Sequence, residues 1–310
     1  MQEVYACQQS EETDLMKGER HLLKSVDDLY ELFVSLLSFW VEVKRFAERR
    51  IEENKNKNFP TQEDLNPNLK FVNNRVLNVL DQNKHLGSLE QQFKINWADY
   101  REDFIRGFYV KLTQYPEYQE YMNSKSSTFS NDRNFLADVI DKYMAEDDVL
   151  FDFFADRSLT FNSDYQLGVY LLWKFIKEMP ASFDADTKLP PVYKTEEEDE
   201  NKDRRFVVDL FRKTMLHNEE YQKMLAEKVS NWDYDRLALM DQIIMTMAVT
   251  EFCDFPSVPI KVTINEYIEI SKFYSTPESH RFVNGMLDKM AQVLKEEGKI
   301  KKSGRGLIDK

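Results

Sequence analysis

Between residues 20 and 50, apolar positions recur at spacings of three and four, which is the period of one face of an α-helix. These positions are Leu22, Val26, Leu29, Tyr30, Phe33, Leu36, Leu37 and Trp40. Shorter patterns predict further helices over residues 71–80, 97–115, 132–156 and 164–178, the second of them ended by Pro116. Polar stretches at 54–68 and 123–131 predict the loops between them.

Residues 181–201 predict a flexible acidic linker. The segment follows Pro180, contains Pro190 and Pro191, and ends in the acidic run Glu196–Glu200. A run of like charges without apolar positions favours a solvated chain over a packed element. Helical periodicity resumes near Asp203.

The last hundred residues contain clearer signals for helix ends. Thr263-Ile264-Asn265-Glu266 matches a capping box, and Thr276-Pro277-Glu278 matches an N-cap residue followed by proline at the first helical position. A single apolar stripe follows. Its members are Phe282, Val283, Met286, Leu287, Met290, Val293 and Leu294.

Composition agrees with a helical protein. The 310 residues include only 8 Gly and 9 Pro, and 42% of them are hydrophobic, which suffices for one large or two smaller cores. Cys7 and Cys253 are far apart in sequence and suit a reducing cytoplasm, rather than a disulfide framework or a metal site. No apolar run approaches the roughly 20 residues of a membrane span, and no export leader opens the chain.

Charge leaves the class of partner open. A net charge of −13 by itself argues against nucleic acid, because phosphates repel an acidic surface. The last sixteen residues, however, carry a local basic group. Its members are Lys295, Lys299, Lys301, Lys302, Arg305 and Lys310, set against Glu296, Glu297 and Asp309. The sequence is therefore compatible with a local basic face near the C-terminal end.

No catalytic motif accompanies these patterns. His21, His85, His217 and His280 are scattered and form no H-x-x-x-H or H-E-x-x-H pattern. The sequence contains no G-x-S-x-G, Walker or G-x-G-x-x-G motif, and its many carboxylates are typical of solvated helical faces. We therefore expect a non-enzymatic protein without catalytic residues, metal or cofactor.

A weak internal similarity is also present. Residues 132–138 resemble residues 203–209, and further matches at the same offset join Met144 to Met215 and Asp164 to Asp235. A duplicated helical unit explains the similarity, and so does chance among amphipathic helices of similar composition.

Three runs of the C-terminal region resemble the NusB family of bacterial transcription antitermination factors. They are Asp241–Glu251, Val258–Glu266 and the long Ser279–Lys289, which is the most specific. Val4-Tyr5-Ala6 is similar to the end of the family's first helix. The resemblance covers roughly a hundred residues, and enlarged NusB-like chains of this kind are found in the Bacteroidetes group.

The resemblance implies an all-α helical bundle with a large helical insertion. The expected organisation is a remnant of the first helix (1–10), an inserted helical region that includes the possible repeat (11–180), the acidic linker (181–201), the NusB-like domain (202–295) and a basic tail (296–310). The family's first helix follows an arginine-rich segment, whereas Met1 aligns inside that helix. Either translation starts upstream, or this form binds RNA more weakly.

The family implies binding to boxA-type RNA of ribosomal leader transcripts, together with the small-subunit ribosomal protein NusE. The pair joins an antitermination complex on RNA polymerase. A protein scaffold that has lost RNA contact, or an accessory of ribosomal RNA processing, are the alternatives. The fold also serves as the RNA-binding domain of an rRNA cytosine methyltransferase, but this chain lacks the long catalytic domain.

Matching residues give candidate sites. Arg281 and Phe282 match the family's basic–aromatic pair at the RNA surface, where a ring stacks on a base and a cation meets phosphate. Tyr5, Asp241 and Glu278 match polar groups that face NusE, although capping, surface charge or packing explain each equally well. Asn284 and Gly285 are expected to serve packing, with the glycine permitting a close helix approach.

Overall fold

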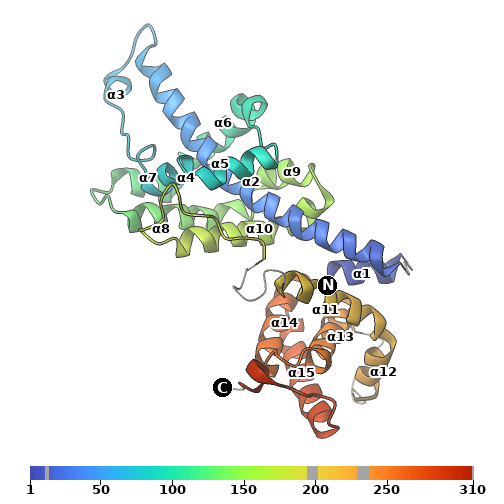
Figure 1. Cartoon of the computed structure of the whole chain (residues 1–310). Helices are drawn as coiled ribbons and strands as arrows, with labels where there is room; N and C mark the ends of the chain where they lie inside the picture. Colours follow the sequence, from blue (N-terminus) through green and yellow to red (C-terminus); the bar gives the residue numbers. More distant parts are fainter. Residues whose placement is uncertain (11–13, 194–201, 229–236, 309–310) are drawn as a thin grey trace. The chain divides into compact units, whose positions relative to one another are not determined.

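The computed structural model describes residues 1–10, 14–193, 202–228 and 237–308. Its helices form two compact units (Figure 1). One unit joins residues 1–24 to residues 193–310, and the other consists of residues 25–192. In the described residues every regular element is helical, as the sequence predicts, and none of these helices is long and apolar enough to cross a membrane.

The unit of residues 25–192 is built around one helix. The elements are α2 (Leu15–Lys55, which belongs to this unit from Ser25 on), α3 (Gln62–Leu65), α4 (Arg75–Asp81), α5 (Lys84–Gln92), η1 (Ala98–Tyr100), η2 (Arg101–Ile105), α6 (Arg106–Leu112), α7 (Pro116–Asn123), α8 (Phe129–Val139), η3 (Ile140–Met144), α9 (Asp148–Ala155) and α10 (Leu159–Glu178). Every residue of α2 from Leu32 to Lys44 is buried, on all sides of the helix. A helix enclosed in this way acts as the core around which the others pack.

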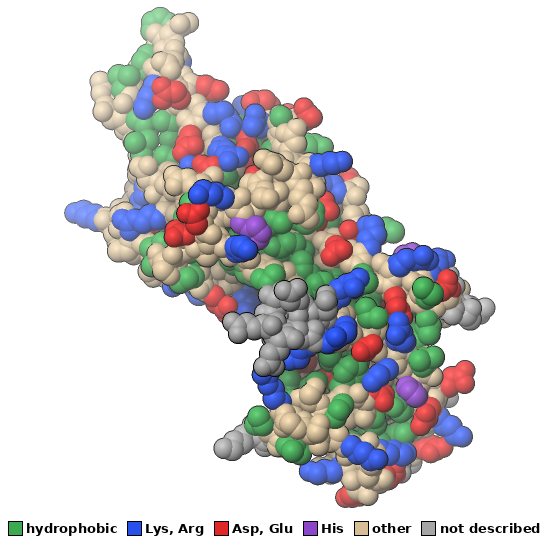
Figure 2. All heavy atoms as spheres, viewed as in Figure 1, with side chains coloured by type: hydrophobic (Ala, Val, Ile, Leu, Met, Phe, Trp, Pro, Cys, Tyr) green, Lys and Arg blue, Asp and Glu red, His purple; other side chains and the backbone are tan. Residues whose placement is uncertain are grey.

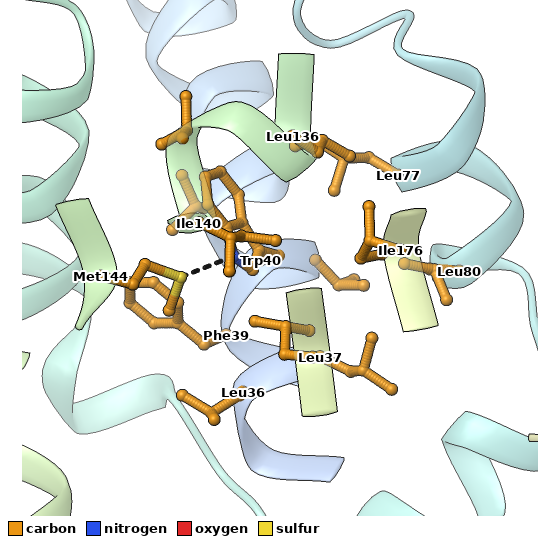
Figure 3. Close-up of a cluster of buried hydrophobic side chains, with 14 of the residues drawn as sticks. Leu36, Leu37, Phe39, Trp40, Leu77, Leu80, Leu136, Ile140, Met144 and Ile176 are labelled. Carbon is orange, nitrogen blue, oxygen red and sulfur yellow. Dashed lines mark hydrogen bonds between the residues drawn. The ribbon is translucent and has the colours of Figure 1, made fainter. Parts of the chain in front are cut away.

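Trp40 lies at the centre of this core (Figure 3). Its side chain is 2% exposed, and its indole nitrogen lies 3.2 Å from the Met144 sulfur. The ring of neighbouring Phe39 packs edge-on against Phe108, with centroids 4.8 Å apart. The predicted amphipathic helix over residues 20–50 is therefore confirmed, but in its middle it is apolar on more than one face.

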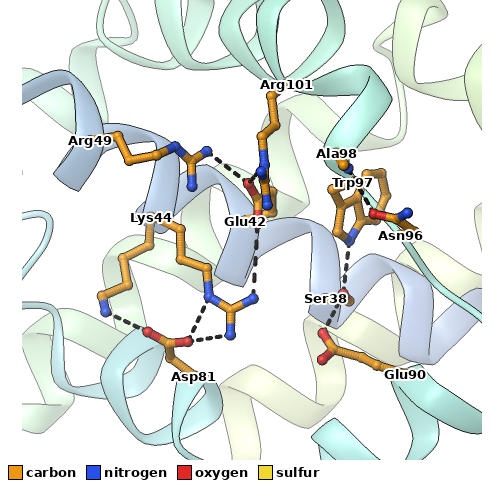
Figure 4. A network of polar contacts seen from close by, with 11 residues as sticks. Ser38, Glu42, Lys44, Arg49, Asp81, Glu90, Asn96, Trp97, Ala98 and Arg101 are labelled. Carbon is orange, nitrogen blue, oxygen red and sulfur yellow. Dashed lines mark hydrogen bonds and ion pairs between the residues drawn. The ribbon is translucent and has the colours of Figure 1, made fainter.

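Charged groups on α2 are neutralised within the same unit (Figure 4). Glu42, 1% exposed, accepts hydrogen bonds from Arg49 and Arg101 at 2.8 and 2.7 Å. Asp81 accepts from Lys44 and Arg45, both at 2.8 Å. These pairs satisfy the buried carboxylate of Glu42 and the partly buried carboxylate of Asp81, and they fix α2 against its neighbours; we attribute no further role to them.

The second unit encloses α13 in the same manner. The elements are α1 (Gln2–Gln9), α11 (Lys202–Leu216), α12 (Asn218–Lys228), α13 (Leu239–Asp254), α14 (Ile260–Tyr274), α15 (Ser279–Glu296) and the short η5 (Gly304–Leu307). Helices α1, α11, α12, α14 and α15 all pack against α13. From Ile243 to Phe252 every residue of α13 is buried. The apolar stripe predicted from Phe282 to Leu294 faces this core, with Phe282 and Val293 at its partly buried edge.

Several predicted helix ends are wrong. In place of one α-helix over residues 97–115, a short 3-10 helix, a π-helix and α6 follow one another without a break and end at Leu112, and Pro116 begins α7. Helix α14 begins at Ile260, so Thr263 lies inside it and is no cap. Its buried hydroxyl donates instead to Glu251, at 2.7 Å. Similarly, α15 begins at Ser279, after the Thr276–Glu278 segment.

The flexible-linker prediction is also wrong for residues 181–193. Phe183 and Leu189 are 7% and 2% exposed and belong to the core of the larger unit. Asn83 donates hydrogen bonds to the carbonyls of Asp184 and Thr187, at 3.1 and 2.8 Å. Apolar side chains spaced between prolines therefore dock this segment without forming a helix. The acidic run 196–200 lies outside the described residues.

The repeat remains a hypothesis. Helices α8 and η3 together cover residues 129–144 and α9 covers 148–155, while α11 and α12 cover 202–216 and 218–228. When the first pair of segments is shifted by the offset that places Asp132 on Asp203, its helix ends match those of α11 and α12 to within about two residues. The remaining matches up to Asp235 fall partly outside the described residues.

Candidate functional site

Four hydroxyl and carboxylate groups meet where α14 ends and α15 begins. Asp241, on α13, accepts hydrogen bonds from the Ser275 hydroxyl at 2.6 Å and from the Ser279 hydroxyl at 2.8 Å. The Thr276 hydroxyl lies 2.7 Å from that of Ser279. Asp241 is 4% exposed, so its carboxylate is held almost entirely by protein groups.

This network fixes the segment that carries the predicted site residues. Hydrogen bonds to a buried carboxylate are stronger than neutral ones, because one partner is charged and water is excluded. The amide of Ser279 also donates to the Thr276 carbonyl, at 2.9 Å. The first turn of α15, with Glu278 and Arg281, is thereby anchored to α13. Asp241 thus has an internal structural role that its sequence position did not reveal.

Glu278 and Arg281 form an exposed ion pair on that turn. Their side chains are 78% and 77% exposed, and the guanidinium lies 3.2 Å from the carboxylate. A pair this exposed contributes little to stability, since water and salt screen it. Both groups are therefore accessible to a ligand. Phe282, the next residue, is partly buried at the edge of the apolar stripe and packs against the core.

The next turns of α15 present small and polar groups to solvent. Asn284, Gly285 and Asp288 are all exposed. A Cβ at Gly285 would meet no atom within 4 Å, so the expectation that this glycine permits a close helix approach is wrong. Glycine inside a helix costs about 1 kcal/mol relative to alanine. No internal packing offsets that cost, and the backbone of α15 lies open beside Arg281.

Tyr5 lies on α1, apart from the other predicted residues. Val4 and Cys7 face the core, whereas the Tyr5 side chain is 39% exposed. Helix α1 packs against α11 and α13. Within the described chain, no hydrogen bond or ion pair joins Tyr5 to Glu278 or Arg281. The structure therefore brings Asp241, Glu278, Arg281 and the edge of Phe282 to one end of α15, and leaves Tyr5 on a different helix.

A second buried carboxylate was not anticipated. Glu251 accepts hydrogen bonds from Thr263 at 2.7 Å and from Tyr267 at 3.2 Å, and thus joins α13 to α14. Burial raises the pKa of Glu251, and also raises the pKa of Tyr267 well above its usual value. No local motif marks Glu251, because its partners are 12 and 16 residues away.

The described residues contain no assembly of three or more His, Cys, Asp or Glu side chains suited to a metal ion. The histidines have separate local contacts: His85 accepts a hydrogen bond from the amide of Leu189 at 2.9 Å, and His217 lies 3.5 Å from Glu220. Basic and acidic side chains are interspersed over the face seen in Figure 2.

Comparison with known proteins identifies relatives of the C-terminal region. The family model described as "NusB family" matches residues 176–292. A transcription antitermination protein NusB from Salinibacter ruber is 38% identical over 125 residues, which cover 40% of this chain and 78% of that protein. NusB of Chloroherpeton thalassium is 38% identical over 35% of this chain and 51% of its own length. NusB of Koribacter versatilis is 40% identical, over 32% and 67% respectively. No solved structure matches the chain.

Proposed function

Since this chain belongs to the NusB family, we propose that it acts in transcription antitermination by binding boxA-type RNA of ribosomal leader transcripts together with the ribosomal protein NusE. The matched relatives, which are transcription antitermination proteins by name, support the general role. The RNA, NusE and the assembly on RNA polymerase in the cytoplasm are the specific parts of the proposal. The role requires binding alone, and no catalytic residue or cofactor enters it.

The observation that carries the proposal is the accessible first half of α15. The charged side chains of Glu278, directly before the helix, and of Arg281 in its first turn are about four-fifths exposed, yet this turn is anchored by buried Asp241. Side chains on an anchored turn lose little conformational freedom when a ligand binds. Gly285 adds an open stretch of backbone at the same face.

RNA contact is assigned to Arg281 and Phe282. A guanidinium suits phosphate or a base edge, and an aromatic ring at the rim of a core offers one face for stacking. A stacked base contributes roughly 1–3 kcal/mol to binding. Binding requires Arg281 to exchange its partner Glu278 for phosphate, and this exchange is inexpensive because the pair is exposed.

NusE contact is assigned to Tyr5 and Glu278. Tyr5 lies on α1 and Glu278 directly precedes α15 in the same unit, so a protein partner touching both has to span α1 and the start of α15. Asp241, which is 4% exposed, is assigned a positioning role instead of a direct contact. It holds Ser279, and thereby Glu278, in place.

The test for RNA is a gel shift with boxA-type RNA, with and without NusE. We expect Phe282→Ala and Arg281→Ala to weaken the shift while the melting temperature stays near that of the parent protein. Phe273→Ala is the matched control, because Phe273 is a 48% exposed ring on α14. If Phe282→Ala unfolds the protein, Phe282 is a core residue, and Arg281→Ala alone decides the assignment.

The test for the partner uses charge reversal. Glu278→Lys should weaken association with NusE, measured by calorimetric titration. Glu269→Lys is the matched control, since Glu269 forms an equally spaced ion pair with Lys272 on α14. Equal effects of both substitutions would contradict the assignment of Glu278.

One observation favours a second candidate, a protein scaffold without RNA contact. The net charge of −13 opposes RNA, and Glu278 neutralises Arg281 in the unbound chain. Unchanged mobility of RNA in both gel lanes, together with retained NusE binding, would favour the scaffold.

A further inference from the structure

The chain beyond α15 is folded back onto the turn between α13 and α14. The ammonium group of Lys302 donates to the carbonyls of Glu251 and Phe255, at 3.2 and 3.0 Å. The amide of Ser303 donates to the carbonyl of Pro256, at 2.9 Å. Lysine bonded to the last carbonyls of a helix is a favourable C-terminal cap, so the segment helps to complete α13.

Gly306 fixes this docking. A Cβ at this position would lie 1.9 Å from the Pro256 carbonyl oxygen, a distance that no side chain tolerates. The segment from Lys299 to Leu307 therefore has a defined place on the unit. It is not simply a solubilising extension of the helix.

The docked segment, the end of α15 and the start of α14 line an open cavity of about 380 Å³. Its lining residues are Ile260, Lys295, Ile300, Lys301, Lys302, Gly306 and Leu307. Lys295 and Lys301 are exposed, and within the described residues neither forms an ion pair. Lys299 differs, because its ammonium lies 3.0 Å from Glu297. Lys295 and Lys301 thus line a cavity together with aliphatic side chains, in a chain whose net charge is strongly negative.

This cavity continues the exposed face of α15 that begins at Arg281. Residues four, seven, eleven and fourteen positions after Arg281 share its face, since a helix turns 3.6 residues per revolution. These residues are Gly285, Asp288, Gln292 and Lys295, and all are exposed. At 1.5 Å per residue, the stripe from Arg281 to Lys295 is about 21 Å long. Asp288 is its one acidic member.

We propose that Lys295 and Lys301 form a second RNA contact, which holds backbone phosphates of the strand that leaves Arg281 along this stripe. Ammonium groups recognise phosphate charge and carry no base preference, so the contact is independent of sequence. Ile300 and Leu307 provide apolar contact for a ribose or base. The inference rests on the proposed function in that the ligand is the same RNA, but it does not require boxA or NusE.

The experiment compares the double variant Lys295→Glu/Lys301→Glu with Lys174→Glu/Lys177→Glu. The control changes the same charge at two exposed lysines of α10, in the other unit. Full-length proteins are titrated by fluorescence anisotropy against a boxA-type RNA and an oligouridine of equal length, at several salt concentrations. For single strands, each phosphate contact contributes about 0.7 to the slope of log affinity against log salt. We expect the double substitution at the cavity to make this negative slope shallower by about 1.4 for both RNAs, because two contacts are lost, and the control substitutions to leave it near the parent value.

The outcomes separate this contact from the proposed function. An equal reduction of the salt slope for both RNAs supports the phosphate contact. This holds even if the parent protein binds boxA-type RNA no better than oligouridine; that lack of preference would reject only the proposed function. An unchanged slope in the cavity variant overturns the contact, while a boxA preference that depends on Phe282 keeps the proposed function. Absence of measurable RNA binding by the parent protein overturns both. Asp288→Asn provides an opposite-sign check, because removing the carboxylate should strengthen binding to both RNAs.

Discussion

Asp241→Asn tests whether the buried carboxylate positions the start of α15. The substitution keeps the shape of the side chain and one acceptor oxygen, but it removes the charge. Ser275 and Ser279 now donate to Asp241 at 2.6 and 2.8 Å. In the variant, one serine keeps an acceptor, and the other meets an amide group and has to accept instead.

The expected magnitude follows from the charge assistance that is lost. Hydrogen bonds to charged groups contribute about 1.5–3 kcal/mol, against about 1 kcal/mol for neutral ones. Two bonds therefore weaken by about 2 kcal/mol in total. Little of this is screened, because Asp241 is 4% exposed. A local free energy of opening that falls by about 2 kcal/mol corresponds to roughly 30-fold faster amide exchange.

Hydrogen exchange followed by mass spectrometry measures this directly. We expect faster exchange in peptides that cover residues 276–284, and unchanged exchange in peptides from residues 32–44 of α2. Asp288→Asn is the control, because it removes an exposed carboxylate of α15 without touching the serines. Exchange at residues 276–284 that matches the parent protein would refute the positioning role. Faster exchange throughout the α13–α15 unit would show that Asp241 supports global stability instead.

Three further predictions concern stability. Trp40→Ala should lower the free energy of unfolding of the 25–192 unit by about 3–5 kcal/mol, because the ring is only 2% exposed and its removal leaves a cavity. Urea titrations followed by circular dichroism measure this value, and a loss below about 1 kcal/mol would contradict the packing. The hydrogen bond from Lys142 lowers the pKa of Glu117 from 4.5 to about 2, so the ionised carboxylate stabilises the fold above pH 4.5, and this contribution is lost as the pH falls towards 2. Glu117→Gln should therefore flatten the profile of the urea midpoint against pH between these values, and an unchanged profile would reject the pairing. Gly306→Ala should release the docked segment and speed tryptic cleavage after Arg305, because the new Cβ collides with the Pro256 carbonyl; equal cleavage rates would show that the segment is not held there.

The helical class and the C-terminal stripe were predictable because they depend on local period. Val283, Met286 and Leu287 face the core as their spacing requires. Long-range partners were not predictable. Thr263 resembles a capping residue in sequence, but its hydroxyl is used by buried Glu251 on another helix. Phe183, too, lies in a segment whose prolines and charges suggested a linker, although the ring is buried.

The candidate site shows the same division. The resemblance indicated Glu278, Arg281 and Asp241, but the sequence did not distinguish the exposed pair from the buried carboxylate, whose serine partners are 34 and 38 residues away. Gly285 was expected to pack closely, and it is open to solvent. A glycine that admits a neighbouring helix and one that leaves space for a ligand are identical in sequence, and only the surrounding atoms separate them.

Sedimentation velocity of the full-length protein mixed with NusE and a fluorescent boxA-type RNA tests the central claim most directly. The account predicts one RNA-containing species that is heavier than either binary complex, and that is lost on Arg281→Glu but retained on Lys272→Glu. RNA that sediments as the unbound strand in every mixture, with no association between the two proteins, would contradict it.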